Sequence, residues 1–135
     1  MRLSLFVTLT SGVFAIAACV PHRDLPPDQI EKLGKLDEVM DVQATVADPQ
    51  FKKIGNTSFT DQDWAAFADM ANRLQVTSRK IPQFSKGPEF DKLAAQLGER
   101  AQVLGKIAEA KDASKASDAL AGIKATCKEC HSKFK

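Results

Sequence analysis

Apolar residues recur at intervals of three and four along almost the whole chain from residue 28 onward. This is the period of an amphipathic α-helix, and no stretch of strand length alternates with a period of two. The pattern falls into four segments, which we place at residues 28–54, 60–81, 88–108 and 112–134. Because short connections make consecutive helices neighbours, the sequence predicts an all-α fold, an antiparallel up-down-up-down four-helix bundle.

Residues with special backbone roles predict where the helices begin and end. Thr60 is a good N-cap, and Phe59 and Trp64 occupy the N′ and N4 positions of a hydrophobic staple. Pro49 lacks a backbone donor and crowds the preceding turn, so we expect the first helix to kink or restart there. The apolar stripe of that first helix comprises Ile30, Leu33, Leu36, Met40, Ala44, Ala47, Phe51 and Ile54.

Composition limits the chain to one ordinary domain. Its 135 residues have room for a single core, and the 44% of hydrophobic residues suffices to build it. The 19 basic and 17 acidic residues are spread along the chain, with no basic stripe. Charge therefore identifies no partner, and we expect no binding to nucleic acid.

Residues 1–18 predict an exported protein. They hold Arg2 as their one charge and then an apolar run too short to span a bilayer, which is typical of a secretory signal peptide. The letters IAAC at residues 16–19 resemble a bacterial lipobox, so we expect cleavage before Cys19 and acylation of that cysteine. The letters AIA at residues 15–17 also fit ordinary secretory cleavage, which would leave a soluble periplasmic protein.

The acyl chains would hold the protein on the periplasmic side of a bacterial membrane without a spanning helix. Val20 lacks the Asp that resembles an inner-membrane retention signal, which favours the outer membrane. Residues 19–27 hold three prolines and are interpreted as a tether, in which His22 is solvated. The folded domain is then residues 28–135.

The letters ATCKECHSKFK close the chain and carry its chemistry. On a helix, Cys127, Cys130 and His131 project from roughly one face, and Cys-x-x-Cys-His is the c-type haem attachment pattern. A thioredoxin-like dithiol would need its first cysteine at a helix N-terminus. A structural zinc site needs four ligands, and the only other Cys and His residues are Cys19 and His22. One covalently attached haem c per chain is therefore the predicted cofactor.

The other side of the iron decides what such a haem does. A sixth protein ligand gives an electron carrier, whereas a vacant position admits a small gas. Met40 and Met70 are the candidates, although core packing is the usual role of a buried Met. In a first helix that starts at Asp28, Met40 lies about 18 Å from the start, while His131 lies about 6 Å from the end of its helix. Leu36 would be closer in height.

A four-helix bundle with CKECHSKFK at the end of its last helix resembles the class II c-type cytochromes, the cytochrome c′ family, over residues 28–135. The resemblance implies Cys127 and Cys130 as thioether cysteines and His131 as the proximal iron ligand. It places Lys135, where the family usually has Arg, near the haem, and a Lys there replaces a planar fork by a point charge. It also takes the distal residue from the first helix, which favours Met40.

These observations predict an exported mono-haem cytochrome that passes single electrons to or from a redox partner protein. The alternative is a five-coordinate haem protein that binds NO or CO. We do not expect an enzyme, since no distal His and Arg pair is evident for peroxidase chemistry. Homodimers, which are frequent in the family, are a further expectation from the resemblance.

Overall fold

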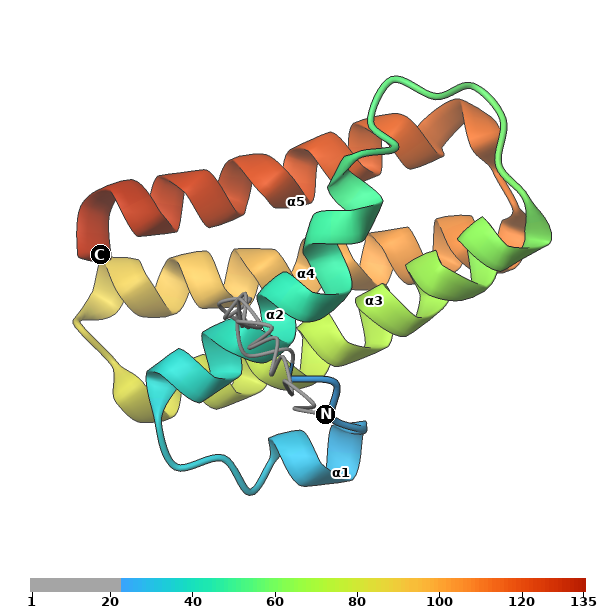
Figure 1. The fold of residues 1–135 in the computed structure, drawn as a ribbon. Helices are drawn as coiled ribbons and strands as arrows, with labels where there is room; N and C mark the ends of the chain where they lie inside the picture. The colour runs from blue at the N-terminus through green and yellow to red at the C-terminus, as the bar shows by residue number, and fades with distance from the viewer. Residues whose placement is uncertain (1–22) are drawn as a thin grey trace, which may run out of the picture.

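Four long helices form the bundle, and a short helix precedes them (Figure 1). The computed structural model describes residues 23–135, and every regular element within that range is helical. The elements are α1 (Pro27–Ile30), α2 (Leu36–Phe51), α3 (Asp61–Lys80), the 3₁₀ helix η1 (Ile81–Phe84), α4 (Pro88–Ala110) and α5 (Ala113–Phe134). The prediction of an all-α helical bundle is confirmed. None of the described helices is long and apolar enough to cross a membrane.

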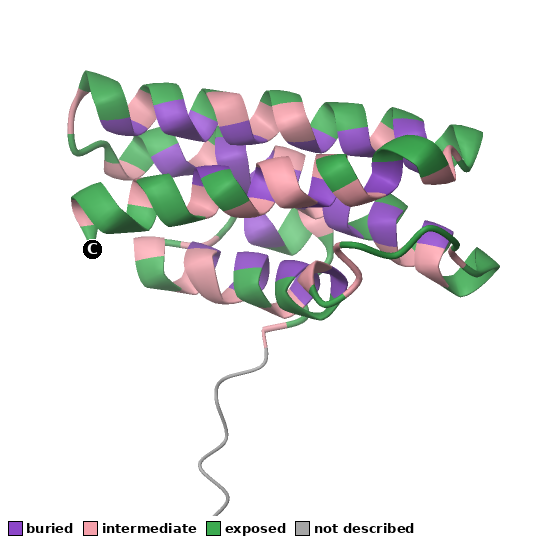
Figure 2. Ribbon diagram, turned by 90° about the horizontal axis from the view of Figure 1, so that it is seen from above, coloured by how far each residue is buried: buried purple, intermediate pink, exposed green. Residues whose placement is uncertain are grey.

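The core lies where α4 packs between α3 and α5, while α2 crosses these helices obliquely (Figure 1). Each long helix turns its buried residues inward and its exposed residues outward (Figure 2). At the start of α3, the rings of Phe59, Trp64 and Phe67 contact one another edge to face, with centroids 5.2 to 5.6 Å apart. Further along, the predicted stripes of α3, α4 and α5 are buried at Ala71, Leu74, Phe90, Leu93, Leu97, Ala101, Leu104, Ala108, Ala116, Leu120 and Ile123.

The first predicted helix is interrupted, but not at Pro49. Residues 31–35 separate α1 from α2, and α2 then runs through Pro49 to Phe51. Pro49 is exposed and third from the end of the helix, so its ring lies outside the packing and only one carbonyl, that of Thr45, loses its helical partner. Gly34 lies at the actual break, where a glycine costs a helix about 1 kcal/mol relative to alanine. The expected break at Pro49 was wrong.

Helix α2 presents two apolar faces instead of one. Val39, Val42 and Val46 are buried, whereas Leu36 and Met40, from the predicted stripe, are only half-buried. Ala44, also placed on that stripe, is exposed. The buried valines lie on the face that packs against the other helices. On this helix the predicted stripe therefore lies at the edge of the core. Leu36 and Met40 face a different surface.

The first described residues are docked on the bundle. The Arg23 side chain forms an ion pair with Glu38 at 3.1 Å, and its backbone N–H donates to Thr45 Oγ1 at 3.1 Å. Asp24 forms an ion pair with Arg73. Residues 23–27 of the predicted tether therefore contact the domain, while the signal segment, Cys19 and His22 lie outside the described residues.

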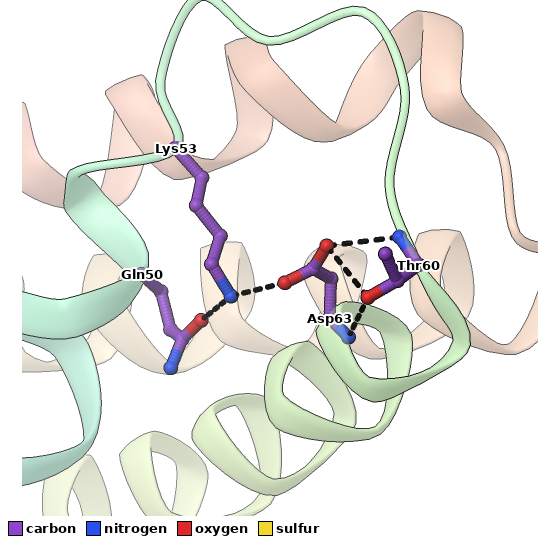
Figure 3. A network of polar contacts seen from close by, with 4 residues as sticks. All are labelled: Gln50, Lys53, Thr60 and Asp63. Carbon is purple, nitrogen blue, oxygen red and sulfur yellow. Dashed lines mark hydrogen bonds and ion pairs between the residues drawn. The ribbon is translucent and has the colours of Figure 1, made fainter.

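The start of α3 was predicted correctly. Thr60 is its N-cap, and Thr60 and Asp63 satisfy each other's backbone N–H groups in a capping box (Figure 3). Lys53 Nζ donates to Gln50 Oε1 at 2.9 Å and forms an ion pair with Asp63. The Lys53 and Thr60 hydrogen bonds lower the pKa of Asp63 to about 2. This network joins the end of α2 to the beginning of α3.

We expect Thr60→Ala to lower the free energy of unfolding by about 1 kcal/mol, because an N-terminal N–H of α3 loses its acceptor. Urea unfolding followed by circular dichroism measures the change. Thr57→Ala is the matched control, since Thr57 is exposed in the same loop and has no hydrogen bond among the described residues. Equal midpoints for the two variants would show that the cap contributes nothing.

Candidate functional site

The Cys-x-x-Cys-His sequence lies in the last turns of a continuous helix. α5 runs unbroken from Ala113 to Phe134, so Cys127, Cys130 and His131 share one side of it. Both cysteines are half-buried free thiols, and His131 is exposed. No strand precedes them among the described residues, and the pair does not lie at a helix N-terminus. The geometry required for a thioredoxin-like dithiol is absent from this part of the chain.

A cavity of about 360 Å³ opens beside these three residues. Helices α2, α4 and α5 supply most of its wall, and it receives all the site residues predicted in the described part of the chain: Met40, Cys127, Cys130, His131 and Lys135. Met70, by contrast, is fully buried in the core and does not line the cavity. The rest of the wall is mainly apolar and includes Leu36, Ile81, Phe90, Leu93, Ala94, Leu97 and Phe134.

The cavity follows from the course of α2. This helix makes far fewer contacts with α5 than α4 does, because it crosses the bundle obliquely (Figure 1). The space between α2 and α5 is therefore bordered by half-buried side chains such as Leu36, Met40 and Cys127 rather than closed by direct packing. The volume of the cavity is within the range of about 300 to 1,000 Å³ that small-molecule and cofactor sites have.

Met40 lies at the height of the motif. Because α2 begins at Leu36 and not near residue 28, Met40 is about 6 Å from the start of its helix at 1.5 Å per residue. His131 lies a similar distance from the end of α5. The offset expected from the sequence was wrong because that prediction placed residues 28–35 in the same helix. Met40 and Leu36 both line the cavity, one turn apart.

Contacts between α4 and α5 hold the motif end of the bundle together. Phe134 meets the ring of Phe90 edge to face at 5.2 Å. Lys86 Nζ donates to the Phe134 carbonyl oxygen at 2.7 Å, and Lys133 forms an ion pair with Glu89 at 2.5 Å. The last turn of α5 is thus fixed against the first turn of α4, which keeps the cavity wall in place.

Burial keeps the thiols neutral. Removal from water raises the pKa of Cys127 to about 11, with a smaller contribution from Cys130, and burial raises the pKa of Cys130 as well. A metal-binding or redox dithiol instead needs a stabilised thiolate. The described residues contain no group of three His, Cys, Asp or Glu side chains placed to hold a metal ion. The described residues therefore offer too few ligands for a structural zinc site.

Sequence reasoning missed five polar wall residues: Asp37, Asp41, Gln43, Lys86 and Thr126. Gln43 is 8% exposed, and its Nε2 donates to Thr77 Oγ1 at 2.9 Å. Its position three residues after Met40 on one helix was a usable signal. Lys86, in the connection between η1 and α4, also lines the cavity and is exposed. No sequence pattern predicts where a loop residue of that kind will lie.

Comparison with known proteins gives one match. Residues 29–135 match the family model described as Cytochrome C′. Neither a curated protein nor a solved structure matches the chain.

The residues of the cavity fit the cofactor of that family, which is one covalently attached haem c per chain. Two thiols and an imidazole lie together on the wall formed by α5, and a thioether lies on the wall formed by α2. The remaining wall is mainly apolar, with Asp37 and Asp41 of α2 and Thr126 of α5 among its polar residues. Cys127 and Cys130 would hold such a group through sulfur, and His131 would bind its iron.

We expect the double variant Cys127→Ala/Cys130→Ala to lose covalent haem completely, because both thioether sulfurs are gone. Mass spectrometry of the denatured protein measures the attached mass. Each single variant should keep one thioether bond, with a lower yield of attached haem. Ser132→Ala is the control, since Ser132 follows the motif, is exposed and does not line the cavity. Covalent haem in the double variant would place the attachment elsewhere.

Proposed function

Because the chain belongs to the cytochrome c′ family, we propose that it carries single electrons to or from a redox partner protein. Proteins of this family are generally non-catalytic haem proteins that transfer electrons or bind gases, and they are typically periplasmic. When bound, the haem supplies one-electron chemistry, since its iron alternates between the ferrous and ferric states. The choice between an electron carrier and a gas-binding protein depends on the residue that faces the iron from α2.

We propose that Met40 would bind the haem iron as a second protein ligand, together with His131. Three observations support this role: Met40 lines the cavity, it belongs to a different wall from His131, and the two lie about 6 Å and about 4.5 Å from the motif end of their helices. Two protein ligands would leave the coordination of the iron the same in both oxidation states. Electrons then move with little rearrangement of the protein.

The other wall residues exclude water and fix the two ligands. Leu93 and Leu97 are each 5% exposed, and Phe90 is 3% exposed. Helix α4 therefore lines the cavity between α2 and α5 with buried apolar side chains. Lys86 and Lys135 are exposed and supply positive charge to the wall, while Asp37 and Asp41 supply negative charge on the α2 side. Lys135 offers a point charge there and no bidentate contact.

Leu36 supports the alternative function. It lines the same wall of α2 as Met40, one turn earlier, and cannot bind iron. If the iron faced Leu36, the sixth position would be vacant in an apolar pocket, which suits an uncharged gas such as NO or CO. The two functions therefore differ by one helical turn, and a substitution separates them.

We expect the purified protein to show the spectrum of low-spin haem, including the weak charge-transfer band of Met-ligated ferric iron. Met40→Ala should convert it fully to high-spin haem that responds to CO, because alanine supplies no ligand. Met70→Leu is the control, since Met70 lies outside the cavity. A wild-type spectrum that is already high-spin and shifts with CO would contradict the electron-carrier proposal and support gas binding.

We propose further that Cys19 is acylated and anchors the protein to a membrane, on the basis of the letters IAAC at residues 16–19. Several acyl chains, each contributing about 0.8 kcal/mol per buried CH₂, suffice for stable attachment. Cys19→Ser should release the protein into the periplasmic fraction, as measured by immunoblotting of separated membranes. Retention of the variant in the membrane would argue against the lipobox.

A further inference from the structure

The chain enters the bundle on one defined side of α2. Arg23 pairs with Glu38 and donates its backbone N–H to Thr45, and Asp24 pairs with Arg73 of α3. Leu25 packs against a small apolar cluster of Ile30, Val42 and Val76. We call residues 23–26 the docked segment. Contacts to both α2 and α3 fix its place on the bundle.

The docked segment and the Leu36 and Met40 side of the cavity lie on opposite faces of α2, and Asp41, which also lines the cavity, lies between these faces. Glu38 and Thr45, which bind Arg23, are seven residues apart and therefore share one face of the helix. Met40 follows Glu38 by two residues, a rotation of about 200° around the axis. Leu36 shares the face of Met40, and both line the cavity. Figure 1 agrees, because α1 and α5 lie at opposite edges of the view with α2 between them.

The distance from Cys19 to the docked segment is short. Three residues separate Cys19 from Arg23. Even fully extended, four steps of the chain reach at most about 14 Å. An acylated Cys19 must therefore hold Arg23 within that distance of the lipid surface.

We propose that the anchored protein lies with the docked segment toward the membrane and presents the cavity to the aqueous side. Helix α2 then stands between the lipid surface and the haem site. The redox partner consequently approaches from water, as a soluble protein, and not through the plane of the same bilayer. This inference rests on the proposed acylation of Cys19 and deepens the proposed function by naming the kind of partner.

Two native lysines report the orientation. Lys32 lies between Ile30 and Leu33, which both belong to the cluster around Leu25, and Lys128 lies on α5 within the motif. Both are exposed, and neither side chain has a hydrogen bond or ion pair among the described residues. The full-length acylated protein, with its haem, is bound to phosphatidylcholine vesicles and treated with a water-soluble amine reagent. Mass spectrometry compares the labelling rate of each lysine with its rate in soluble Cys19→Ser protein.

We expect vesicle binding to slow the labelling of Lys32 several-fold and to leave Lys128 unchanged. Ferricyanide, a water-soluble one-electron acceptor, should oxidise the reduced bound and soluble proteins at equal rates, because lipid does not cover the cavity. Equal protection of both lysines, stronger protection of Lys128, or several-fold slower oxidation of the bound protein would overturn the proposal.

A longer connection is the matched control. Twelve Gly and Ser residues inserted between His22 and Arg23 leave the acylation signal and the docked segment intact but lengthen the reach. The insertion should abolish the difference between Lys32 and Lys128, and unchanged protection of Lys32 would overturn the short-reach argument. The acyl mass on Cys19 and flotation with vesicles are measured first. Their absence would refute the anchor itself, whereas flotation without protection of Lys32 would refute only the orientation.

Discussion

The packing of α4 between α3 and α5 is the constraint on which the site depends. It joins three helices along their lengths, and at one end the Phe90 and Phe134 rings and the Lys133 and Glu89 ion pair fix the last turn of α5. The direction in which Cys127, Cys130 and His131 point is therefore set by the core and not by a loop. Helix α2 makes little contact with α5, and the cavity is the space that this arrangement leaves.

Helix α2 serves three surfaces at once, and its sequence divides accordingly. Val39 and Val46 face the core, Leu36 and Met40 face the cavity, and Glu38, with Thr45, holds the docked segment. A single helix can do this because successive residues are rotated by about 100°. Gln43 lies at the border of core and cavity, and its hydrogen bond to the fully buried Thr77 satisfies a polar group there. Because the apolar residues of α2 are divided among these surfaces, their periodic pattern is weak. The single apolar stripe predicted from the sequence therefore described this helix poorly.

Local signals predicted the fold well where a residue acts through its own backbone. Thr60 caps α3 and Pro88 opens α4, because a side-chain acceptor or a fixed φ angle decides such positions within one turn. Pro49 misled because the cost of proline depends on its place in the helix, and here it lies exposed in the last turn. The height of Met40 was missed for a related reason, since the apolar period continues across residues 31–35 although the helix does not. The attachment motif could be recognised in the sequence because its chemistry depends on the spacing of its residues. The position of Lys86 could not be predicted, because the path of a loop brings it to the cavity.

The apolar wall of the cavity links stability to function at this end of the bundle. Leu36, Met40 and Phe134 are half-buried, so a haem seated against them completes a burial that the helices leave unfinished. Fully burying such a side chain contributes about 1.5 to 3 kcal/mol, so a haem that buries these side chains in the folded chain would stabilise it. Covalent attachment through α5 removes the loss of that group by dissociation. The side chains that would keep water from the iron would therefore gain their own burial from the haem, and the packing at this end of the bundle would depend on the cofactor.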